Sequence, residues 1–481
     1  MTPPNATATG RTAGSPGTDG PADLPASTRW TIVGLLSASI TINLLDRQTL
    51  AVLAPFLRDP TAAGSPHWQW TNTQYSYIAV AFNLGMMIGQ IPAGTFIDRV
   101  GTKIGLATIF TVWTVICALH AFAGPGTLID SIFGGLYGII PGLPAITGAG
   151  LAGFIVLRFM MGLAECGNYT AGIKALAGLF PAATRSRAGG FFNAGAQFGS
   201  VIAPPLILVL LINTFHVNWQ WAFIIPALLG SLWLIPWLAI FPSKERMNAI
   251  ALKPAATTAA ASAPARQVGL GQLLTNRKVL GLLLIRVFTG PITTFYWTWL
   301  PLYLRSSVES GGRGMSFLAI GFFASVPNLI GMGGNVVGGI VTDKLVKATG
   351  SVDKGRKIAF TCAFGLGALS MAMPWVTNDY VAVLLMGLAL FGNQWVAAVY
   401  IGTVGDVVPQ HLAGRVAGIN GFGDNAASLL AVLLTGAIIE RYGWSQVFVG
   451  AGMLPILAML SVFLVLRRIE PARFDSAGSR G

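Results

Sequence analysis

Formal charge is scarce in this sequence. Of its 481 residues, 10% are Asp, Glu, Lys or Arg and 53% are hydrophobic. Because charged residues make up about 25% of an ordinary soluble domain, this balance excludes that class and predicts a polytopic membrane protein. Acidic residues are the scarcest, 17 against 30 basic ones, which leaves a net charge of +13. In a soluble chain that charge would suggest nucleic acid, so the positions of the basic residues matter.

Cysteine is also rare. Cys117, Cys166 and Cys362 stand in separate apolar segments, without a His or Cys at metal-binding spacing. This pattern excludes a disulfide framework and does not indicate a metal site. The sequence shows no activated nucleophile and no phosphate-binding loop either. We therefore expect neither an enzyme nor a bound cofactor.

Long apolar runs are what the sequence has in abundance. Crossing about 30 Å of hydrocarbon takes about 20 helical residues, and twelve windows are long enough. They lie near residues 30–54, 72–97, 103–123, 151–179, 188–213 and 219–241, and near 278–304, 315–342, 357–376, 380–404, 413–439 and 445–466. The sequence therefore predicts an all-α membrane protein with twelve transmembrane helices in two six-helix bundles.

Composition divides the chain into five parts. We predict a disordered cytoplasmic tail, a first bundle, a cytoplasmic linker, a second bundle and a second cytoplasmic tail, over residues 1–29, 30–241, 242–277, 278–468 and 469–481. The first tail and the linker are rich in Pro, Ala and Thr and lack an apolar run. The uncharged stretch 131–150 is interrupted by Pro141, Pro144 and several glycines. We predict a hairpin outside the membrane there, not a thirteenth span.

Lys and Arg gather on one side of the predicted membrane. They fall in the tails, the linker and the even-numbered loops, whereas Arg58, Arg305, Arg313 and Arg441 fall on the other side. Since Lys and Arg accumulate in cytoplasmic loops, both termini are predicted in the cytoplasm, in a multi-pass protein of the inner (cytoplasmic) cell membrane. This distribution explains the positive charge without a nucleic-acid partner. Membrane lipid headgroups are the expected contacts of these side chains.

The two sets of spans repeat each other. "FPAATRSRAGGFF" (180–192) aligns with "VPQHLAGRVAGIN" (408–420), which places Pro181 on Pro409 and Arg187 on Arg415. "GTFIDRVGTKIG" and "GGIVTDKLVKATG" likewise follow the second span of each half. Secondary transporters use such parallel halves to build a central site and to move around it.

These stretches resemble the major facilitator superfamily. Its loop signature is similar to Asp98, Arg99, Gly101 and Lys103, with a degenerate copy at Asp343. The resemblance implies that these residues latch the cytoplasmic face between the bundles. Within the superfamily, "LLDRQTL", "LRFMMGLAECGNYTAGIKAL", "FFNAGAQFGSVIAPPL", "WQWAFII" and "WLPLYL" are similar to the anion:cation symporter family, and most of all to its hexuronate and sugar-acid branch.

Three positions depart from that family. Its members commonly have Tyr two positions before the Asp46–Arg47 pair, where this chain has Leu44. They also commonly have Asp before the proline of the seventh span, where this chain has Gly290. Asp424, in the eleventh span, stands where a small residue is expected. These departures concern the cargo more than the fold.

Charged residues inside the spans are the main functional candidates, because a charge at the bilayer centre costs about 2.5–3.5 kcal/mol on insertion scales. The first span contains Asp46 and Arg47. The fourth contains Arg158 and Glu165, which share one helical face about 10 Å apart along the axis. A carboxyl group in a medium of low dielectric holds a proton more readily, so Asp46 and Glu165 are predicted proton carriers. Arginine stays charged and matches a carboxylate, so Arg47 and Arg158 are predicted anchors for an anion.

Two interpretations of these four residues are open. In the functional one, ionised Asp46 and Glu165 pair with the arginines until protonation frees the arginines for the anion; the family resemblance implies the same roles. In the structural one, pairs such as Asp46–Arg158 or Arg47–Glu165 only hold the bundles together. Arg286, in the seventh span, is either an inner gate or a contact with lipid headgroups.

A sugar acid also presents hydroxyls and an apolar ring face, so its pocket needs amides and aromatic rings beside the arginines. The remaining predicted substrate-binding residues are Asn193, Gln197, Tyr296, Trp299, Asn393, Trp395, Asn420, Asp424 and Asn425. For Asp424, a hydrogen-bonded contact between helices is the alternative.

The favoured hypothesis is a monomeric secondary active transporter that imports a small organic anion together with a proton by alternating access. The expected cargo is a sugar acid, a hexuronate such as galacturonate or glucuronate. An aldonate, an aldarate or an aromatic acid is the alternative cargo. Outside this class, the alternative is a transporter-like receptor or a channel, although duplicated halves and buried carboxylates favour alternating access.

Overall fold

The computed structural model describes residues 24–127, 129–132, 150–180, 182–251, 269–409 and 412–472. These residues are helical apart from short connections, and none of them forms a strand. Most of the first tail, most of the predicted hairpin 131–150, the middle of the linker and the end of the second tail lie outside the described residues.

Eleven helices are long and apolar enough to cross a membrane, and a bent helix, α2 (Asn72–Val100), supplies a further candidate. Its two parts, Asn72–Gln90 and Pro92–Val100, meet at an angle of 51°. A proline inside a helix removes a backbone donor and clashes with the preceding turn, which accounts for the bend. With α2 counted as one span, the described chain has the twelve predicted spans.

The helices follow the predicted windows. The first half contains α1 (Ala26–Arg58), α2, α3 (Thr102–His120), α5 (Leu151–Leu179), α6 (Ala182–Pro204) continued by η1 (Pro205–Thr214), and α7 (Trp221–Ile240). The second half contains α10 (Arg277–Arg305), α11 (Phe317–Phe323) with α12 (Ser325–Thr349), α13 (Val352–Ala368) with η3 (Leu369–Trp375), α14 (Asp379–Val407), α15 (Ala413–Tyr442), and α16 (Trp444–Leu460) with η5 (Ser461–Leu466). The shorter helices are α8 (Lys244–Ala251), α9 (Leu270–Thr275) and η2 (Val308–Ser310).

Polar side chains fix where several spans begin. The Thr71 hydroxyl accepts a hydrogen bond from the backbone N–H of Gln74, and the Gln74 side chain accepts one from the N–H of Thr71, so a capping box starts α2. Asn276 and Asn378 cap α10 and α14 through their side-chain oxygens. Because unpaired backbone donors are costly where water is scarce, these caps define the ends of three helices that border the centre of the molecule.

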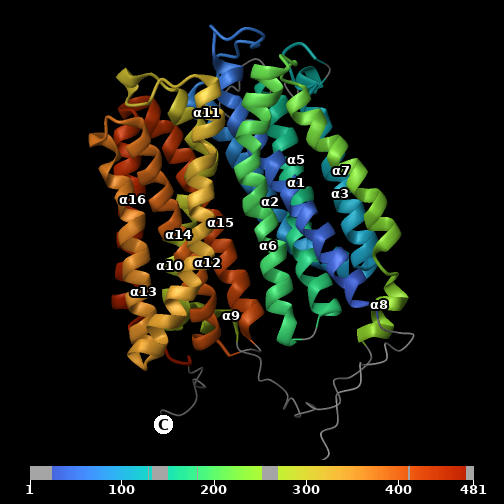
Figure 1. Cartoon of the computed structure of the whole chain (residues 1–481), viewed down its shortest axis with the longest axis vertical. Coiled ribbons are helices and arrows are strands. Elements are labelled where there is room, and N and C mark those ends of the chain that lie inside the picture. The colour runs from blue at the N-terminus through green and yellow to red at the C-terminus, as the bar shows by residue number, and fades with distance from the viewer. Residues whose placement is uncertain are drawn as a thin grey trace, which may run out of the picture.

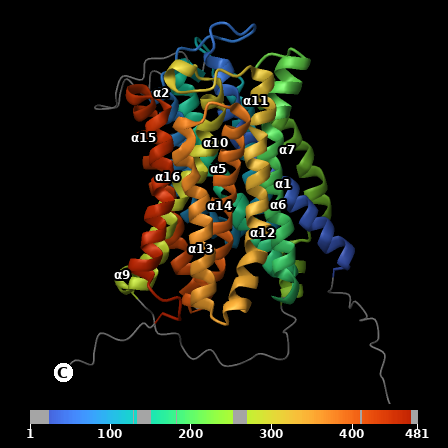
Figure 2. The same ribbon diagram turned by 60° about the vertical axis from the view of Figure 1, so that its left-hand side comes forward.

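The spans form two bundles that stand side by side, the first half in blue to green and the second in yellow to red (Figures 1 and 2). Both bundles contain the same close contact. A Cβ on Gly85 of α2 would lie 2.2 Å from the carbonyl oxygen of Phe159 in α5, and one on Gly334 of α12 would lie 2.2 Å from that of Phe391 in α14. Only glycine lets two helix backbones approach so closely. These are the second and fourth spans of each half, so the duplication in the sequence is also present in the packing.

The molecule has two distinct ends. One, the linker end, carries α8 and α9; the other, the α11 end, carries α11 (Figures 1 and 2). Hydrogen bonds join the two halves at the α11 end. Arg305 Nε, at the end of α10, donates to Asp59 Oδ2, just beyond α1, at 2.8 Å. Tyr75 of α2 donates to the carbonyl oxygen of Thr298 in α10 at 2.9 Å.

At the linker end, ion pairs connect helices of the same half. Lys174 of α5 pairs with Asp98 of α2, and Arg356 of α13 pairs with Asp406 of α14. Each pair ties two neighbouring helices of one bundle together where they leave the apolar region.

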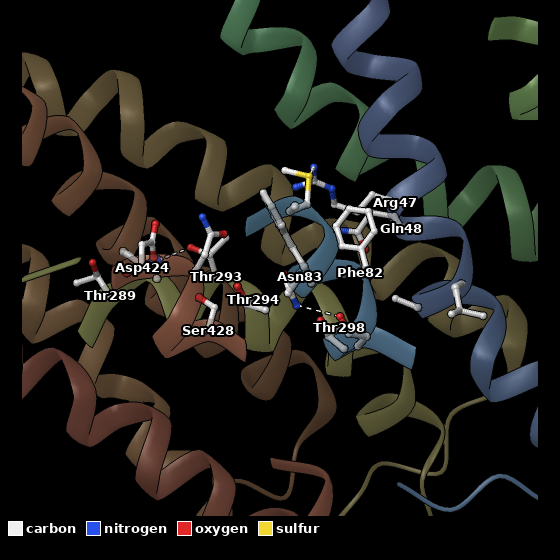
Figure 3. Close-up of a pocket in the computed structure, with 18 of the residues that line it drawn as sticks. Arg47, Gln48, Phe82, Asn83, Thr289, Thr293, Thr294, Thr298, Asp424 and Ser428 are labelled. Atoms are coloured by element: carbon white, nitrogen blue, oxygen red, sulfur yellow. Dashed lines mark hydrogen bonds between the residues drawn. The ribbon is translucent and has the colours of Figure 1, made fainter. Parts of the chain in front are cut away.

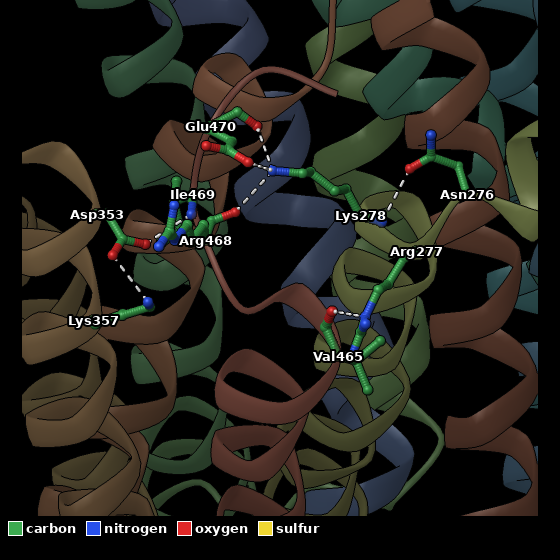
Figure 4. Close-up of polar contacts among 9 residues, drawn as sticks. All are labelled: Asn276, Arg277, Lys278, Asp353, Lys357, Val465, Arg468, Ile469 and Glu470. Atoms are coloured by element: carbon green, nitrogen blue, oxygen red, sulfur yellow. Dashed lines mark hydrogen bonds and ion pairs between the residues drawn. The ribbon is translucent and has the colours of Figure 1, made fainter. Parts of the chain in front are cut away.

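The segment after η5 is bound to the linker end of the second bundle (Figure 4). Lys278 Nζ, at the start of α10, donates to the carbonyl oxygens of Arg468 and Glu470 at 3.1 and 3.2 Å, and to Glu470 Oε1 at 2.9 Å. The backbone N–H of Ile469 donates to Asp353 Oδ1 at 2.7 Å. The first residues of the predicted second tail therefore pack against the helices.

Candidate functional site

A cavity of about 380 Å³ lies between the two bundles, within the size range of small-molecule sites. Its charged residues are Arg47 and Arg158 from the first half, with Arg286 and Asp424 from the second. Beside apolar and aromatic residues, the lining contains many uncharged polar ones: Gln48, Asn83, Gln197, Thr289, Thr293, Thr294, Thr298, Asn393, Gln394, Asn425 and Ser428. Figure 3 shows the residues around Arg47 and those around Asp424 on opposite sides of the cavity.

Arg47 presents its guanidinium to the cavity with Glu165 behind it. Nε and Nη2 of Arg47 lie 3.4 and 3.3 Å from Oε1 of Glu165, and the guanidinium lies 5.0 Å from the centre of the Phe82 ring. The Glu165 side chain is completely buried, whereas that of Arg47 is 24% exposed. The ion pair between Arg47 of α1 and Glu165 of α5 therefore forms, and Arg47 is the partner that faces the cavity.

Asp46 points elsewhere. It is completely buried and does not line the cavity. Its carboxylate accepts hydrogen bonds from Trp113 Nε1 at 2.6 Å and from Cys117 Sγ at 2.9 Å, both on α3. Among the described residues it forms no ion pair with Arg158, so the predicted Asp46–Arg158 contact does not form in this structure. Trp113 and Cys117 were not predicted as partners, although they stand four residues apart on one face of the third span.

Arg158 is the unusual cation of the site. It is 3% exposed and lines the cavity. Its Nε and Nη2 atoms have no hydrogen-bond partner among the described residues. A buried guanidinium with unpaired donors is energetically costly unless something supplies acceptors. This arrangement suits the binding of an anion.

The second half contributes an ion pair between Arg286 of α10 and Asp424 of α15. The Arg286 guanidinium also lies over the Tyr400 ring, 5.6 Å from its centre. A Cβ on Gly290 would lie 1.4 Å from Oδ1 of Asp424, so the carboxylate occupies the space that a side chain at position 290 would need. Two departures from the family pattern, Gly290 and Asp424, are therefore one structural feature. Asp424 faces the cavity, and so does Arg286, for which an inner gate and a headgroup contact were the two expectations.

Of the remaining predicted binding residues, Gln197, Asn393 and Asn425 line the cavity. Asn393 Nδ2 donates to Thr293 Oγ1 at 2.6 Å, which joins α14 to α10 at the cavity wall. The structure thus brings together predicted amides from three helices, α6, α14 and α15.

Five predicted binding residues do not line the cavity. Four of them form hydrogen bonds within their own half: Asn193 with Gly189, Tyr296 with Ser370, Trp395 with Thr342 and Asn420 with Tyr400. The fifth, Trp299, packs against Trp444 of its own half and against Tyr75 of the other half. Trp297 lines the cavity from α10 in place of Tyr296 and Trp299. Adjacent helical residues point about 100° apart, so Tyr296 can face another helix while Trp297 faces the cavity.

The threonines in the polar wall of α10 were not predicted, although the sequence carries their signal. Arg286, Thr289, Thr293 and Trp297 recur at intervals of three or four residues, the spacing of one helical face. All four line the cavity. On α15, Asp424 and Ser428 have the same spacing. A search for polar residues that recur at this spacing would have found Thr289, Thr293 and Ser428.

The predicted gating residues other than Arg286 lie at the linker end. Asp98 pairs with Lys174 of its own half, and the carbonyl oxygen of Arg99 accepts a hydrogen bond from Lys244 Nζ at 2.7 Å. Gly101 has a φ of +87° between α2 and α3, which favours glycine. The carbonyl oxygen of Lys103 accepts from Trp237, and Asp343 is exposed. These contacts lie within the first bundle or join it to α8, so the described residues do not form the expected latch between the bundles in this structure.

The described residues also limit the chemistry of the site. No group of three or more His, Cys, Asp or Glu in this part of the chain is placed to hold a metal ion. What the cavity offers is guanidinium, carboxylate, amide and hydroxyl groups.

Comparison with known proteins gives these features a context. The model of the Major Facilitator Superfamily matches residues 36–350 and 348–481. The hexuronate transporter of Escherichia coli (strain K12) is 29% identical over 458 residues, which cover 92% of this chain and 95% of the relative. The probable galactarate/D-glucarate transporter of Bacillus subtilis (strain 168) is 30% identical over 470 residues, 94% of each chain.

A solved structure shares the fold. A bacterial homolog of the human lysosomal transporter Spinster, in an inward-facing and occupied conformation, has a TM-score of 0.69 and 12% identity, over 92% of this chain and 98% of that one. The spans, the duplicated halves and the matched family model agree. The chain is a multi-pass membrane protein that belongs to the Major Facilitator Superfamily, a family of transporters and not of enzymes.

Proposed function

We propose that this chain is a proton-coupled symporter of a sugar-acid anion, and that its cargo is a hexuronate such as galacturonate or glucuronate. The observation that carries the proposal is the buried Arg158 guanidinium, which lines a cavity between the halves and has unpaired donors. A carboxylate matches these donors in number and geometry. The names of the two relatives, a hexuronate transporter and a probable galactarate/D-glucarate transporter, support the same class of cargo.

Glu165 couples the proton to the anion in this proposal. Ionised Glu165 holds Arg47 through two contacts of 3.3 and 3.4 Å. Protonation removes the negative partner, and Arg47 is then available for the cargo carboxylate. Proton and anion therefore favour each other's binding, as thermodynamic linkage requires. Asp46, buried one residue before Arg47, is the second proposed proton carrier.

In this proposal, the two bundles move so that the cavity opens to one side of the membrane at a time, which is alternating access. We place the linker end in the cytoplasm because Lys and Arg gather there. The hydrogen bonds at the α11 end, Arg305–Asp59 and Tyr75–Thr298, then close the outer side. Opening that side breaks these contacts, while the loops that contain Asp98 and Asp343 approach each other at the other end.

Uptake into proteoliposomes tests the proposal. Labelled galacturonate should accumulate when an inward proton gradient is imposed, and a protonophore should abolish the accumulation. Glu165→Gln should still exchange labelled for unlabelled cargo but should not accumulate it. Asp406→Asn breaks an Asp–Arg pair away from the cavity and is the matched control, which should accumulate cargo as the wild type does.

Three results would contradict the proposal. Undiminished accumulation by Glu165→Gln would remove its coupling role. Absence of uptake for every sugar acid would reject the cargo class. Ion conductance through the reconstituted wild-type protein, without gradient-driven accumulation, would favour the channel alternative.

A further inference from the structure

We infer that the second half of the cavity binds the hydroxyl groups of the cargo and excludes a second carboxylate, and that Asp424 sets this specificity. The inference rests on the proposed function and narrows it to sugar acids that have a single carboxylate. It starts from buried atoms of the cavity lining that lack a hydrogen-bond partner in the described structure.

These atoms are of opposite kinds in the two halves. In the first half they are donors, Nε and Nη2 of Arg158 and Nε2 of Gln48. In the second half they are acceptors, Oδ1 of Asn393 and Oδ1 of Asp424. Buried polar groups in native proteins are seldom left without a partner. The first set therefore indicates an acceptor on the cargo, as a carboxylate provides, and the second indicates a donor, as a hydroxyl provides.

The position of Asp424 gives its two oxygens different roles. The Oδ2 atom pairs with Arg286, which is also held by the ring of Tyr400. The charge of Arg286 is therefore already balanced within the protein, by Asp424. The Oδ1 atom lies beside Gly290, where an added Cβ would be 1.4 Å away. The missing side chain at position 290 lets the carboxylate take this place at the cavity wall.

A second carboxylate would find poor partners there. The side chains near Asp424 in Figure 3, those of Thr289, Thr293, Thr294 and Ser428, are uncharged. The cation of this half is already paired, and Asp424 would repel a like charge. Such juxtaposition is strongly unfavourable and is a common basis for discrimination between ligands.

A hexuronate or an aldonate fits both sides in one orientation. Its carboxylate lies toward Arg47 and Arg158, and its hydroxyls lie toward Asn393 and Asp424. An aldarate has a carboxylate at each end, so it would place one of them against Asp424 in either orientation. Net charge at the second end, not cavity size, makes the distinction.

Ligand-induced changes in Tm of the purified full-length protein test the inference. The probes are galacturonate and galactonate, with one carboxylate, and galactarate and glucarate, with two. In the wild type, the monocarboxylates should raise Tm at concentrations at least about tenfold lower than the dicarboxylates. This comparison needs no variant, so it holds even if a substitution prevents folding.

Asp424→Asn keeps the size of the side chain, removes its charge and leaves Arg286 without its partner. It should shift the preference toward dicarboxylates by at least about tenfold, because Arg286 can then bind the second carboxylate. Arg286→Gln combined with Asp424→Asn should abolish that gain. Asp406→Asn, which also removes an Asp from an Arg pair, should leave the preference as in the wild type.

The results separate this inference from the proposed function. If the wild type binds galactarate as tightly as galacturonate, or if Asp424→Asn leaves their ratio unchanged, the inference is wrong while the symporter proposal stands. If no sugar acid raises Tm, the proposed cargo class is wrong and the inference falls with it.

Discussion

The two halves of the cavity have the same helical plan and different chemistry. Each contributes one arginine–carboxylate pair, Arg47–Glu165 in the first half and Arg286–Asp424 in the second. In the first pair the arginine faces the cavity and the carboxylate is completely buried behind it. In the second pair both partners line the cavity. The first half adds a further cation, Arg158, whose donors are unpaired.

This difference shows that the two halves of a duplicated fold need not present the same chemistry to the cavity between them. The glycine contacts of α2 with α5 and of α12 with α14 keep the two backbones alike. The side chains on the cavity faces are free to differ, because they take no part in these backbone contacts. A cargo with one charged end and one hydroxylated end then has a preferred orientation.

Replacing Arg158, the cation with unpaired donors, should have the largest effect on transport. Arg158→Gln should lower galacturonate uptake at least about 30-fold, since losing one partner of a buried charge pair costs about 2–5 kcal/mol. Arg158→Lys should restore part of the uptake, because it keeps the charge without the planar fork. Uptake of labelled cargo into proteoliposomes measures both.

Arg356→Gln is the control for this experiment, because it removes an arginine from an ion pair at the linker end. It should retain uptake. Uptake by Arg158→Gln at the wild-type level would mean that the first half does not hold the carboxylate.

Changing the second half should have a smaller effect. Gly290→Ala adds a Cβ that would lie 1.4 Å from Asp424 Oδ1, so the carboxylate must move. We expect galacturonate to bind about tenfold more weakly, since overpacking typically costs about 1–3 kcal/mol. Gly365→Ala, on α13 with open space around the added atom, is the matched control. Equal affinities for the two variants, measured by isothermal titration, would exclude a binding role for the Asp424 position.

The sequence predicted the spans, the duplication and the cavity positions of Arg47, Arg158, Gln197, Asn393 and Asp424. Apolar length and internal repeats determine the first two, and a charge within a span has few other places to go. The sequence did not predict which way Asp46 points, because the partner Trp113 lies on a helix whose rotation is set by packing. The aromatic residues were the least predictable, since Tyr296 and Trp297 differ by one position and face different neighbours.

The contact between the halves at the α11 end should matter less than either binding surface. Burial alone raises the pKa of the Asp59 carboxyl, but hydrogen bonds from Thr61 and Arg305 outweigh it and hold the pKa below the ordinary value. A group with a lowered pKa contributes fully above its ordinary pKa, about 3.9 for Asp, and loses its contribution only as the pH falls through the lowered value. Asp59 therefore stays charged from about pH 5 to pH 8.

Asp59→Asn should accordingly slow uptake by at most about fivefold, because the state closed at the α11 end becomes less populated. The shape of the pH profile between about pH 5 and pH 8 should remain that of the wild type. In the same assay, uptake by Glu165→Gln should no longer depend on pH between about pH 5 and pH 8. A profile that disappears in Asp59→Asn would move the proton-sensitive site from the first half of the cavity to the junction of the halves.

The smallest expected effect tests whether the proposed proton site of the first half includes Asp46 as well as Glu165. Trp113→Phe removes the 2.6 Å hydrogen bond to Asp46 and keeps an aromatic ring against Phe110. Trp233→Phe is a close control, because its indole also packs on Phe110 but donates to the carbonyl oxygen of Leu35 at 2.8 Å. Both variants should lower Tm, since each loses one internal hydrogen bond worth about 0.5–3 kcal/mol. Uptake should fall by no more than about threefold in either.

If Asp46 carries a proton, Trp113→Phe alone should change the pH at which uptake is half-maximal, because it alone alters the contacts of that carboxylate. The same pH profile in both variants would make Asp46 a structural residue and leave Glu165 as the proton carrier of the pair.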